Sequence, residues 1–228
     1  MKEQTYLDVI YHYKESRYPE LLADYLVDKY FNKGYRLLEI GAGRGQYITA
    51  FRKKRPKQPL GMQAFGINKG PPGSPSLFID YRDLEKESVD YPDNHFHYVF
   101  SKSCIEHIWN TENLLAETYR VLKPGGIAIF MTPDWGTDYK YFWDDPTHVR
   151  AFTRKGLQDA FKFMGFVDVK CEHFWQLPWL WRYPFLEPLR WIISLLPNRW
   201  KWKDREQLNQ RVLVRHSKER MLLCVAKK

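Results

Sequence analysis

The chain has 228 residues, 44% of them hydrophobic, and a formal net charge of +9. This length and composition predict one sizeable hydrophobic core, and therefore a single domain over residues 1–228. The three cysteines are odd in number and far apart, which excludes a disulfide framework and a zinc-ligand spacing. They favour a reducing compartment, which here means the cytoplasm.

Residues 1–5 lack the apolar stretch of a secretory signal, and no run of about 18 apolar residues follows anywhere in the chain. The sequence therefore predicts no helix that crosses a membrane. The excess of positive charge leaves two classes of macromolecular partner, nucleic acid and an anionic membrane surface.

The N-terminal segment, residues 1–34, is rich in leucine and tyrosine. Its apolar residues recur at spacings of three and four, which predicts two amphipathic helices that meet near residues 16–20. Pro19 suits the first turn of the second helix. We expect both helices to pack against a sheet; a lid over a bound ligand is the alternative.

A glycine-rich corner follows. Residues 37–40 predict a short buried strand and residues 46–54 a helix, and a tight turn between them is indicated by three alternate glycines, Gly41, Gly43 and Gly45. A dinucleotide fingerprint would need a further glycine where Gln46 stands, and a P-loop would need Gly-Lys-Ser/Thr. Glu39 would repel a pyrophosphate, so the corner suits a nucleoside that carries a cationic group.

Two more strands are expected before residue 90. The first lies within residues 57–69 and ends near Asn68, and a loop rich in glycine and proline follows it. The second lies within residues 77–84 and ends in an acidic residue followed by an apolar one. Asp83-Leu84 fits that ending best, and Asp80 is the second choice.

Residues 91–133 carry the longest recognisable pattern. A strand at 97–101 is followed by Cys104-Ile105-Glu106-His107-Ile108 and then by an amphipathic helix. Lys123-Pro124-Gly125-Gly126 is expected to stop that helix, and 127–131 reads as a strand buried on both faces. Farther on, a helix over 154–164 ends at Gly165, a sixth strand covers 166–170 and a seventh covers 221–226.

With the glycine corner, this block resembles the class I S-adenosylmethionine-dependent methyltransferases, in particular the type 11 group. The resemblance implies an α/β fold with a Rossmann-like, seven-stranded, mostly parallel sheet flanked by helices, whose cofactor-binding core would span 35–175. It assigns S-adenosyl-L-methionine to residues at the strand ends: Glu39, Gly41, Ala42, Gly43, Asn68, Asp83, Leu84 and Ser101. Asn68 stands where the family usually has an acid for the ribose hydroxyls.

The acceptor should meet the loops at the carboxyl ends of the strands. The segment around Asp144 to Thr153 resembles one found in methyltransferases of bacterial glycan and lipopolysaccharide assembly. His148 is the first candidate for the general base and His107 the second, although each could instead only order its loop. Aromatic faces and carboxylates suit a sugar, and the candidate substrate-binding residues are Trp135, Tyr141, Asp144, Asp145 and Arg150. These acids and His148 could also ligate a metal, but the resemblance implies none.

The segment between the sixth and seventh strands, residues 176–216, is far longer than a hairpin needs. Six of the nine tryptophans fall between residues 175 and 202, and residues 182–220 hold ten Lys or Arg against four Asp or Glu. A helix over 186–196 should have one narrow polar face. Residues 176–203 could lie on an anionic membrane, or cover the protein's own sheet or a second copy of the chain; nucleic acid is disfavoured.

The sequence thus predicts a methyltransferase for a hydroxyl of a sugar, in a surface glycan or a lipid-linked precursor at the cytoplasmic membrane face. Methylation of an amphipathic lipid or quinone is the alternative within the same reaction class. A non-catalytic scaffold that binds S-adenosylmethionine and recruits a membrane or partner is the alternative from another class. The final segment, 217–228, completes the predicted sheet.

Overall fold

The computed structural model describes residues 16–32, 36–54, 64–66, 79–81, 84–204 and 209–228. Its centre is a seven-stranded sheet in the order β3-β2-β1-β4-β5-β9-β6. These strands are β1 (Leu37–Ile40), β2 (Ala64–Gly66), β3 (Ile79–Tyr81), β4 (Phe96–Lys102), β5 (Leu122–Pro133), β6 (Val167–Phe174) and β9 (Met221–Lys227). β9 pairs antiparallel with both β5 and β6, and the other pairs are parallel. The predicted α/β class with a mostly parallel sheet is confirmed.

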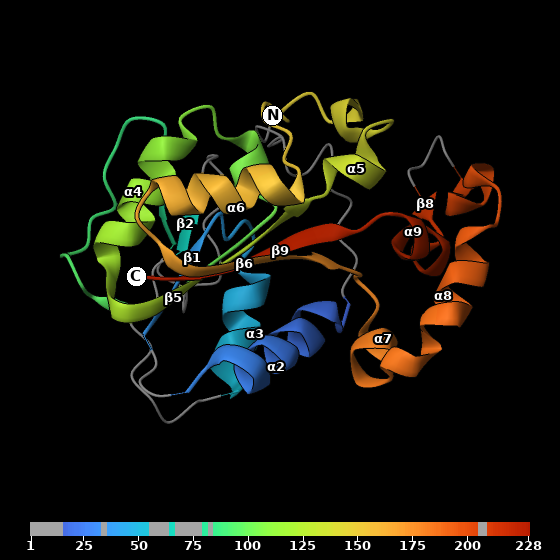
Figure 1. Cartoon of the computed structure of the whole chain (residues 1–228), viewed down its shortest axis with the longest axis horizontal. Helices are drawn as coiled ribbons and strands as arrows, with labels where there is room; N and C mark the ends of the chain where they lie inside the picture. The colour runs from blue at the N-terminus through green and yellow to red at the C-terminus, as the bar shows by residue number, and fades with distance from the viewer. Residues whose placement is uncertain (1–15, 33–35, 55–63, 67–78, 82–83, 205–208) are drawn as a thin grey trace, which may run out of the picture.

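Helices cover both faces of this sheet (Figure 1). On one face lie α4 (Thr111–Val121) and α6 (Arg154–Phe163), whose apolar residues join one buried cluster. On the other face lie α2 (Tyr18–Tyr30) and α3 (Gln46–Lys54), which contribute to a second cluster. A sheet covered on both faces must be apolar on both, which is why β1 is buried at every position.

Local signals set the helix ends. The side chain of Asn110 accepts a hydrogen bond from Asn113 N at the start of α4, and Thr153 Oγ1 accepts one from Gly156 N at the start of α6. Gly165, at a φ of 90°, follows the end of α6 as predicted. The first of the two expected N-terminal helices falls outside the described residues, and α2 corresponds to the second.

One predicted boundary was wrong. Residues 123–126 were expected to separate α4 from a strand at 127–131, but β5 already begins at Leu122. Leu122 pairs with Phe96, and the register shifts before Tyr98 pairs with Ile127. Gly125 takes a φ of 74° within this irregular stretch. The two glycines therefore belong to a bulge inside β5, and regular pairing with β4 resumes after it. They do not only end the preceding helix.

The chain between β6 and β9 forms a separate layer beside the sheet. It contains α7 (Pro178–Arg182), α8 (Glu187–Ser194), α9 (Val212–Lys218) and a two-stranded sheet of β7 (Trp202–Asp204) and β8 (Asn209–Gln210). Short 3₁₀ turns, η3 (Pro184–Leu186) and η4 (Asn198–Lys201), join them. Trp181 anchors the layer, because its ring lies 5.2 Å from Tyr25 of α2 and 5.0 Å from Phe174 of β6.

This layer lies at the end of the sheet toward which β5 and β6 run, beside α5 (Trp135–Asp138) (Figure 1). The carboxyl ends of the parallel strands point the same way, so the layer borders the edge where ligands of such sheets bind. Within the described ranges, no helix combines the length and apolar character needed to cross a bilayer.

Candidate functional site

The turn after β1 holds its glycines in conformations that strain other residues. Gly41 and Gly43 have φ angles of 75° and 52°. A β-carbon on Gly41 would come within 2.5 Å of Cys104 Cβ, so this turn packs directly on the segment after β4. A β-carbon on Gly43 would meet no atom of the described residues within 4 Å. The turn therefore leaves open space against its backbone, where a ligand can lie.

Two buried oxygen atoms without partners border this turn. Glu39 is 2% exposed, and burial raises its pKa to about 8. Ser101 pairs with Ile40 across the strands β1 and β4. Among the described residues, neither Glu39 Oε2 nor the buried Ser101 Oγ has a hydrogen-bond partner. Buried polar atoms are rarely left unsatisfied, so these two atoms fit the polar groups of a bound ligand.

The other predicted cofactor residues fall into two groups. Ala42 is buried in the turn, where its carbonyl accepts a hydrogen bond from Gly45 N at 2.8 Å. Leu84 is fully buried in the cluster that also contains Ile40 and Cys104. Asn68 and Asp83 lie outside the described residues. The structure thus brings the predicted residues of β1, its turn and β4 together at one edge of the sheet.

After β4, the 3₁₀ turn η1 (Ile105–His107) buries a carboxylate that sequence reasoning did not select. Glu106 is 1% exposed, and Thr132 Oγ1 donates a hydrogen bond of 2.9 Å to its Oε2. Its Oε1 has no hydrogen-bond partner in the described part of the chain, and burial raises its pKa to about 7. Its backbone carbonyl accepts hydrogen bonds from Val149 N and Arg150 N, which ties η1 to the loop that carries His148.

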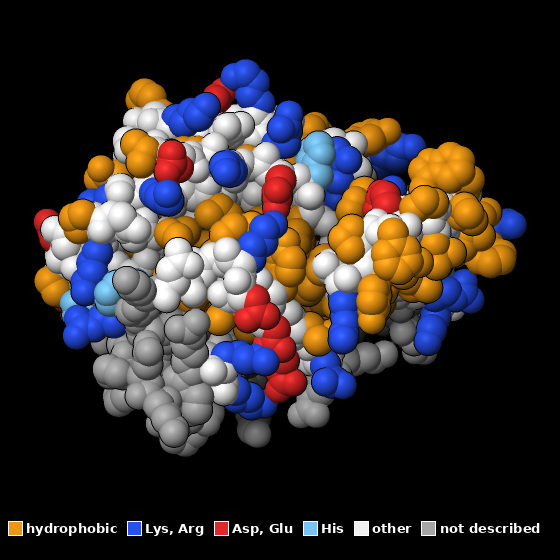
Figure 2. Space-filling view, turned by 60° about the horizontal axis from the view of Figure 1, so that its bottom comes forward, with side chains coloured by type: hydrophobic (Ala, Val, Ile, Leu, Met, Phe, Trp, Pro, Cys, Tyr) orange, Lys and Arg blue, Asp and Glu red, His pale blue; other side chains and the backbone are white. Residues whose placement is uncertain are grey.

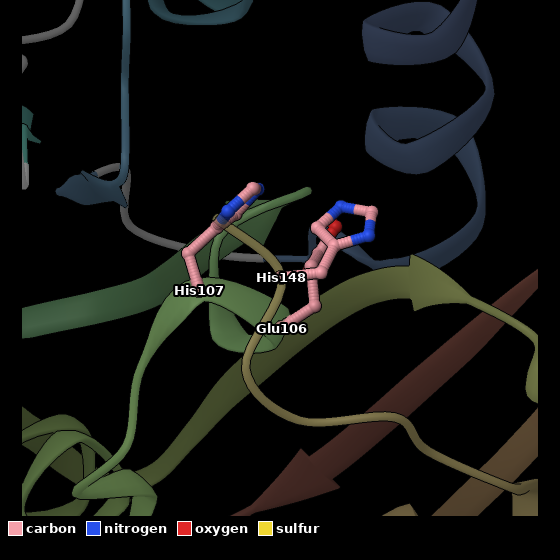
Figure 3. Close-up of side chains that lie close together, drawn as sticks. All are labelled: Glu106, His107 and His148. Carbon is pink, nitrogen blue, oxygen red and sulfur yellow. The ribbon is translucent and has the colours of Figure 1, made fainter. Parts of the chain in front are cut away.

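His107 and His148 lie side by side, with ring centroids 4.7 Å apart (Figure 3). His148 Nδ1 lies 2.6 Å from the carbonyl oxygen of Phe142, and His107 Nδ1 lies 3.2 Å from the carbonyl oxygen of Thr147. A carbonyl only accepts, so both Nδ1 atoms donate, and in the neutral form of either ring the lone pair is on Nε2. Burial, with the nearby ring of His148, lowers the pKa of His107, which keeps it neutral.

Asp145 orders the loop that presents His148. Its Oδ1 accepts hydrogen bonds from Thr147 N at 3.0 Å and from Thr147 Oγ1 at 2.7 Å. Its Oδ2 lies 3.8 Å from His148 Nε2. A carboxylate at this distance stabilises the imidazolium form of His148 if that nitrogen takes up a proton.

The remaining predicted substrate residues do not all converge on the two histidines. The ring centroid of Phe142 lies 5.6 Å from that of Trp135 and 4.3 Å from that of His148. Trp135 therefore belongs to the aromatic group around His148. Asp144 is exposed in the 3₁₀ turn η2 (Phe142–Asp144). Arg150 donates to Thr111 Oγ1 at the start of α4. Tyr141 lies on the other side of the loop, 4.3 Å from Lys201 Nζ.

A group able to ligate a metal also lies here. One ligand atom from each of Glu106, His107 and His148 falls within 4.8 Å of the other two (Figure 3). Two imidazoles and a carboxylate suit zinc or iron better than magnesium. The unpartnered Oε1 of Glu106 is consistent with such an ion. The prediction that the site uses no metal stays a prediction.

Sequence reasoning also missed Lys102 and Tyr18. Lys102 Nζ lies 5.6 Å from the ring centroid of Tyr47 and 5.9 Å from that of Tyr18, and burial lowers its pKa to about 8. The hydroxyl of Tyr18, in α2, is buried and has no hydrogen-bond partner within the described ranges. The start of α2 therefore lies beside the glycine turn. For Lys102 and Glu106 the available signal was adjacency in sequence to Ser101 and His107.

A family model described as a methyltransferase domain matches residues 11–170. Phosphoethanolamine N-methyltransferase 2 of Caenorhabditis elegans is 31% identical over 162 residues, which is 63% of this chain and 35% of that protein. The ubiquinone biosynthesis O-methyltransferase of Cereibacter sphaeroides is 29% identical over 109 residues, which is 44% of this chain and 42% of that protein. The chain thus spans well under half the length of these relatives.

Among solved structures, a SAM-dependent methyltransferase from Archaeoglobus fulgidus superposes with a TM-score of 0.61. The match covers 92% of this chain and 94% of that one at 18% identity. At that identity the likeness concerns the fold.

Proposed function

This chain belongs to the methyltransferase domain family, and from that premise we propose that it transfers the methyl group of S-adenosyl-L-methionine to a sugar hydroxyl in a lipid-linked or surface-glycan precursor. Two observations carry this proposal: His107 and His148 lie together with each Nδ1 facing a carbonyl oxygen, and the turn after β1 borders two buried oxygens that have no partner among the described residues. The turn can hold a cationic nucleoside, and a histidine can accept a hydroxyl proton.

The donor half rests on the turn after β1. S-adenosyl-L-methionine supplies a methyl group that its sulfonium centre already activates. Glu39 would pair its carboxylate with the positive charge of the methionine end, which would return its raised pKa toward the ordinary value. Gly43 keeps its backbone clear for the nucleoside, and Ser101 Oγ offers a hydrogen bond. Asn68, Asp83 and Leu84 remain the proposed contacts to ribose and adenine.

The acceptor half rests on His148, with His107 beside it. A neutral imidazole can take the hydroxyl proton on Nε2 as the oxygen attacks the methyl carbon. Asp145, 3.8 Å from that nitrogen, would stabilise the charge that then forms on His148. Because the methyl group is already activated, the larger contribution is to hold the hydroxyl in line and to exclude water.

The aromatic side chains next to His148 favour a sugar. Trp143 is 55% exposed, and its ring lies 4.9 Å from Phe142 and 6.1 Å from Trp135. An exposed tryptophan beside the base offers a flat apolar face to the C–H side of a sugar ring. In this proposal Trp135 belongs to the aromatic group beside His148, and Asp145 supports His148. Tyr141 and Arg150 would contact the acceptor only if the acceptor is long enough to extend past the loop.

The layer between β6 and β9 supports a membrane location. In α8, Arg190 is 8% exposed and binds Glu187, so the polar face of the helix points inward. Five large apolar side chains of η3, α8 and the residue after α8 are instead exposed: Phe185, Leu189, Trp191, Ile192 and Leu195. Figure 2 shows this apolar patch with Lys and Arg around it. Such a surface fits the headgroup region of an anionic bilayer, at the cytoplasmic face.

A second candidate acceptor is the hydroxyl of a quinone-type or other amphipathic lipid. The similarity to ubiquinone biosynthesis O-methyltransferases favours it, and the same base and apolar surface would serve it. It differs from a sugar in needing an apolar slot beside His148 in place of a stacking face.

Two experiments test the proposal. Calorimetry should detect binding of S-adenosylmethionine and S-adenosylhomocysteine; binding without turnover of any acceptor would indicate a scaffold, and no binding would refute the donor site. Mass spectrometry with lipid-linked sugars, quinols and phosphoethanolamine as acceptors should show methyl transfer to the first. Transfer only to quinols would select the second candidate. EDTA should leave turnover unchanged, and a loss restored by zinc would assign His148 to a metal.

Flotation with anionic vesicles tests the membrane location. We expect the wild-type chain to float and the double variant W191S/I192S to stay at the bottom of the gradient. The matched control is F163S, because Phe163 is 80% exposed on α6, outside the proposed surface. Equal flotation of all three proteins, or none of the wild type, would contradict the proposal.

A further inference from the structure

A cavity of about 340 Å³ lies between the layer of α7–α9 and the loop that follows α5. Tyr139, Lys140 and Tyr141 line it from the loop, and Trp175, Arg190, Lys201 and Lys218 are among the residues that line it from the layer. Its volume falls in the range of small-molecule sites. Four of its lining residues are cationic, and no Asp or Glu is among the described residues that line it.

Two of these cations are buried and fixed in place. Arg190 is 8% exposed; it donates to Glu187 and to the carbonyl of Ser217, and its guanidinium lies 3.9 Å from the ring centroid of Trp175. Lys201 is 4% exposed and forms an ion pair of 2.5 Å with Glu219. Arg215 forms an ion pair with the same carboxylate.

The other two cations have no carboxylate partner among the described residues. Lys218 Nζ donates to the carbonyl of Ser194, a neutral group. Lys140 is exposed and lies 5.7 Å from the ring centroid of Tyr139. Burial and the ammonium of Lys201 lower the pKa of Lys218, as expected for a cation held near another. The cavity therefore has an excess of positive charge that a bound anion would relieve.

The position of the cavity relates it to both proposed surfaces. Residues 139–141 line the cavity, and the next residues of the same loop lead to Phe142, Trp143 and His148. From the other side, α8 contributes Arg190 and Ser194 to the wall while it exposes Trp191 and Ile192 to solvent. The cavity thus shares one wall with the loop that leads to His148 and another with the helix that exposes the apolar patch.

We propose that this cavity binds a phosphate or diphosphate group of the acceptor, so that a group attached on one side reaches His148 and a group attached on the other reaches α8. Lysine and arginine donate charge-assisted hydrogen bonds to phosphate oxygens, and the tyrosine and tryptophan rings form the walls. The placement of the acceptor rests on the proposed methyl transfer, whereas the binding of the anion does not. The phosphate could belong to a lipid-linked sugar or to a water-soluble phosphate ester.

Calorimetry with inorganic pyrophosphate, on the full chain and without a methyl donor, tests the anion site directly. We expect one binding site whose affinity falls with added salt. K218M and K140Q should each weaken binding about 10- to 100-fold, the usual cost of losing a charged hydrogen bond. The matched control K162Q removes an exposed lysine of α6 and should bind as the wild type does.

The outcomes separate the sources of the phosphate. Displacement of pyrophosphate by a polyprenyl diphosphate in detergent micelles, more strongly than by phosphoethanolamine, would assign a lipid-linked phosphate; the reverse order would assign a soluble ester. No binding of pyrophosphate, or equal binding by wild type, K218M and K140Q, would overturn the proposal. If pyrophosphate binds as expected and no acceptor is methylated, the proposed function fails and the anion site stands.

Discussion

The two halves of the candidate site are built in different ways. The donor half depends on backbone: Gly41 at a φ of 75°, packed on Cys104, with Glu39 at the end of a fully buried strand. The acceptor half depends on hydrogen bonds that hold loops: Thr147 Oγ1 donates to Asp145, Val149 N donates to the carbonyl of Glu106, and His107 Nδ1 contacts the carbonyl of Thr147. Backbone constraints leave a local mark in the sequence, whereas the contacts of Glu106 and His107 join segments that are far apart in the sequence.

Mutations in the two halves should therefore affect different properties of the protein. Changes in the donor half should alter folding and cofactor binding together, because the turn is part of the core. Changes in the acceptor half should alter the rate of methyl transfer while the fold and cofactor affinity persist. Four substitutions test this contrast.

The largest expected effect is on His148. Removing a general base typically costs about 100- to 10,000-fold in rate, so H148A should lower kcat by that range. S-adenosylmethionine affinity and the melting temperature should change little, because the ring lies in a loop. The matched control is H95A, a histidine near the start of β4 and outside the site. Equal losses in kcat for both variants would contradict the role of His148.

Gly41 should show the opposite pattern. In G41A the new methyl group would meet Cys104 Cβ at 2.5 Å and would impose a strained φ, so we expect a loss of about 1–3 kcal/mol in unfolding free energy and weaker cofactor binding. G125A is the control, since Gly125 also has a φ of 74° but no atom within 4 Å of its added methyl. Chemical denaturation measures both; similar losses would mean that contact with Cys104 is unimportant.

Glu39 makes the stability of the cofactor-free protein depend on pH. Its pKa is raised to about 8 in the fold, whereas an unfolded glutamate titrates near its ordinary value, so the unfolded chain releases the proton first. Stability should therefore fall as pH rises from about 5 to about 8. The melting temperature of E39Q should fall less over this window. E112Q, at an exposed position, serves as control; parallel curves for both variants would contradict the assignment.

The smallest effect should come from Arg150. Its side chain hydrogen-bonds Thr111 at the start of α4 and is exposed. R150A should lower kcat/KM less than about fivefold, since one exposed hydrogen bond contributes about 1 kcal/mol or less. A loss of kcat comparable to that of H148A would show that Arg150 contacts the acceptor, as the sequence pattern suggested.

The strands and helices followed from periodicity because the sheet is buried on both faces and its helices are amphipathic. The glycine turn followed from spacing, and the boundary of β5 was wrong because glycines suit a bulge as well as a helix stop. Glu106 was missed because a carboxylate is normally exposed, and only the fold buries it. Tyr141 and Arg150 stand beside His148 in sequence, but tertiary contacts with Lys201 and Thr111 direct them elsewhere.

The inward polar face of α8 could not be read from the sequence either. An amphipathic pattern defines two faces but does not say which faces the protein. Arg190 points inward because Glu187, the carbonyl of Ser217 and the ring of Trp175 satisfy its guanidinium. The apolar face is then left for solvent or a membrane.

The central claim is methyl transfer to a hydroxyl oxygen with His148 as the base. The most direct measurement uses S-adenosylmethionine with a trideuterated methyl group, a lipid-linked sugar as acceptor, and fragmentation of the product by mass spectrometry. We predict one trideuteromethyl ether on the sugar, equimolar S-adenosylhomocysteine, and loss of both in H148A. Label on nitrogen or carbon, or an undiminished yield with H148A, would contradict the account.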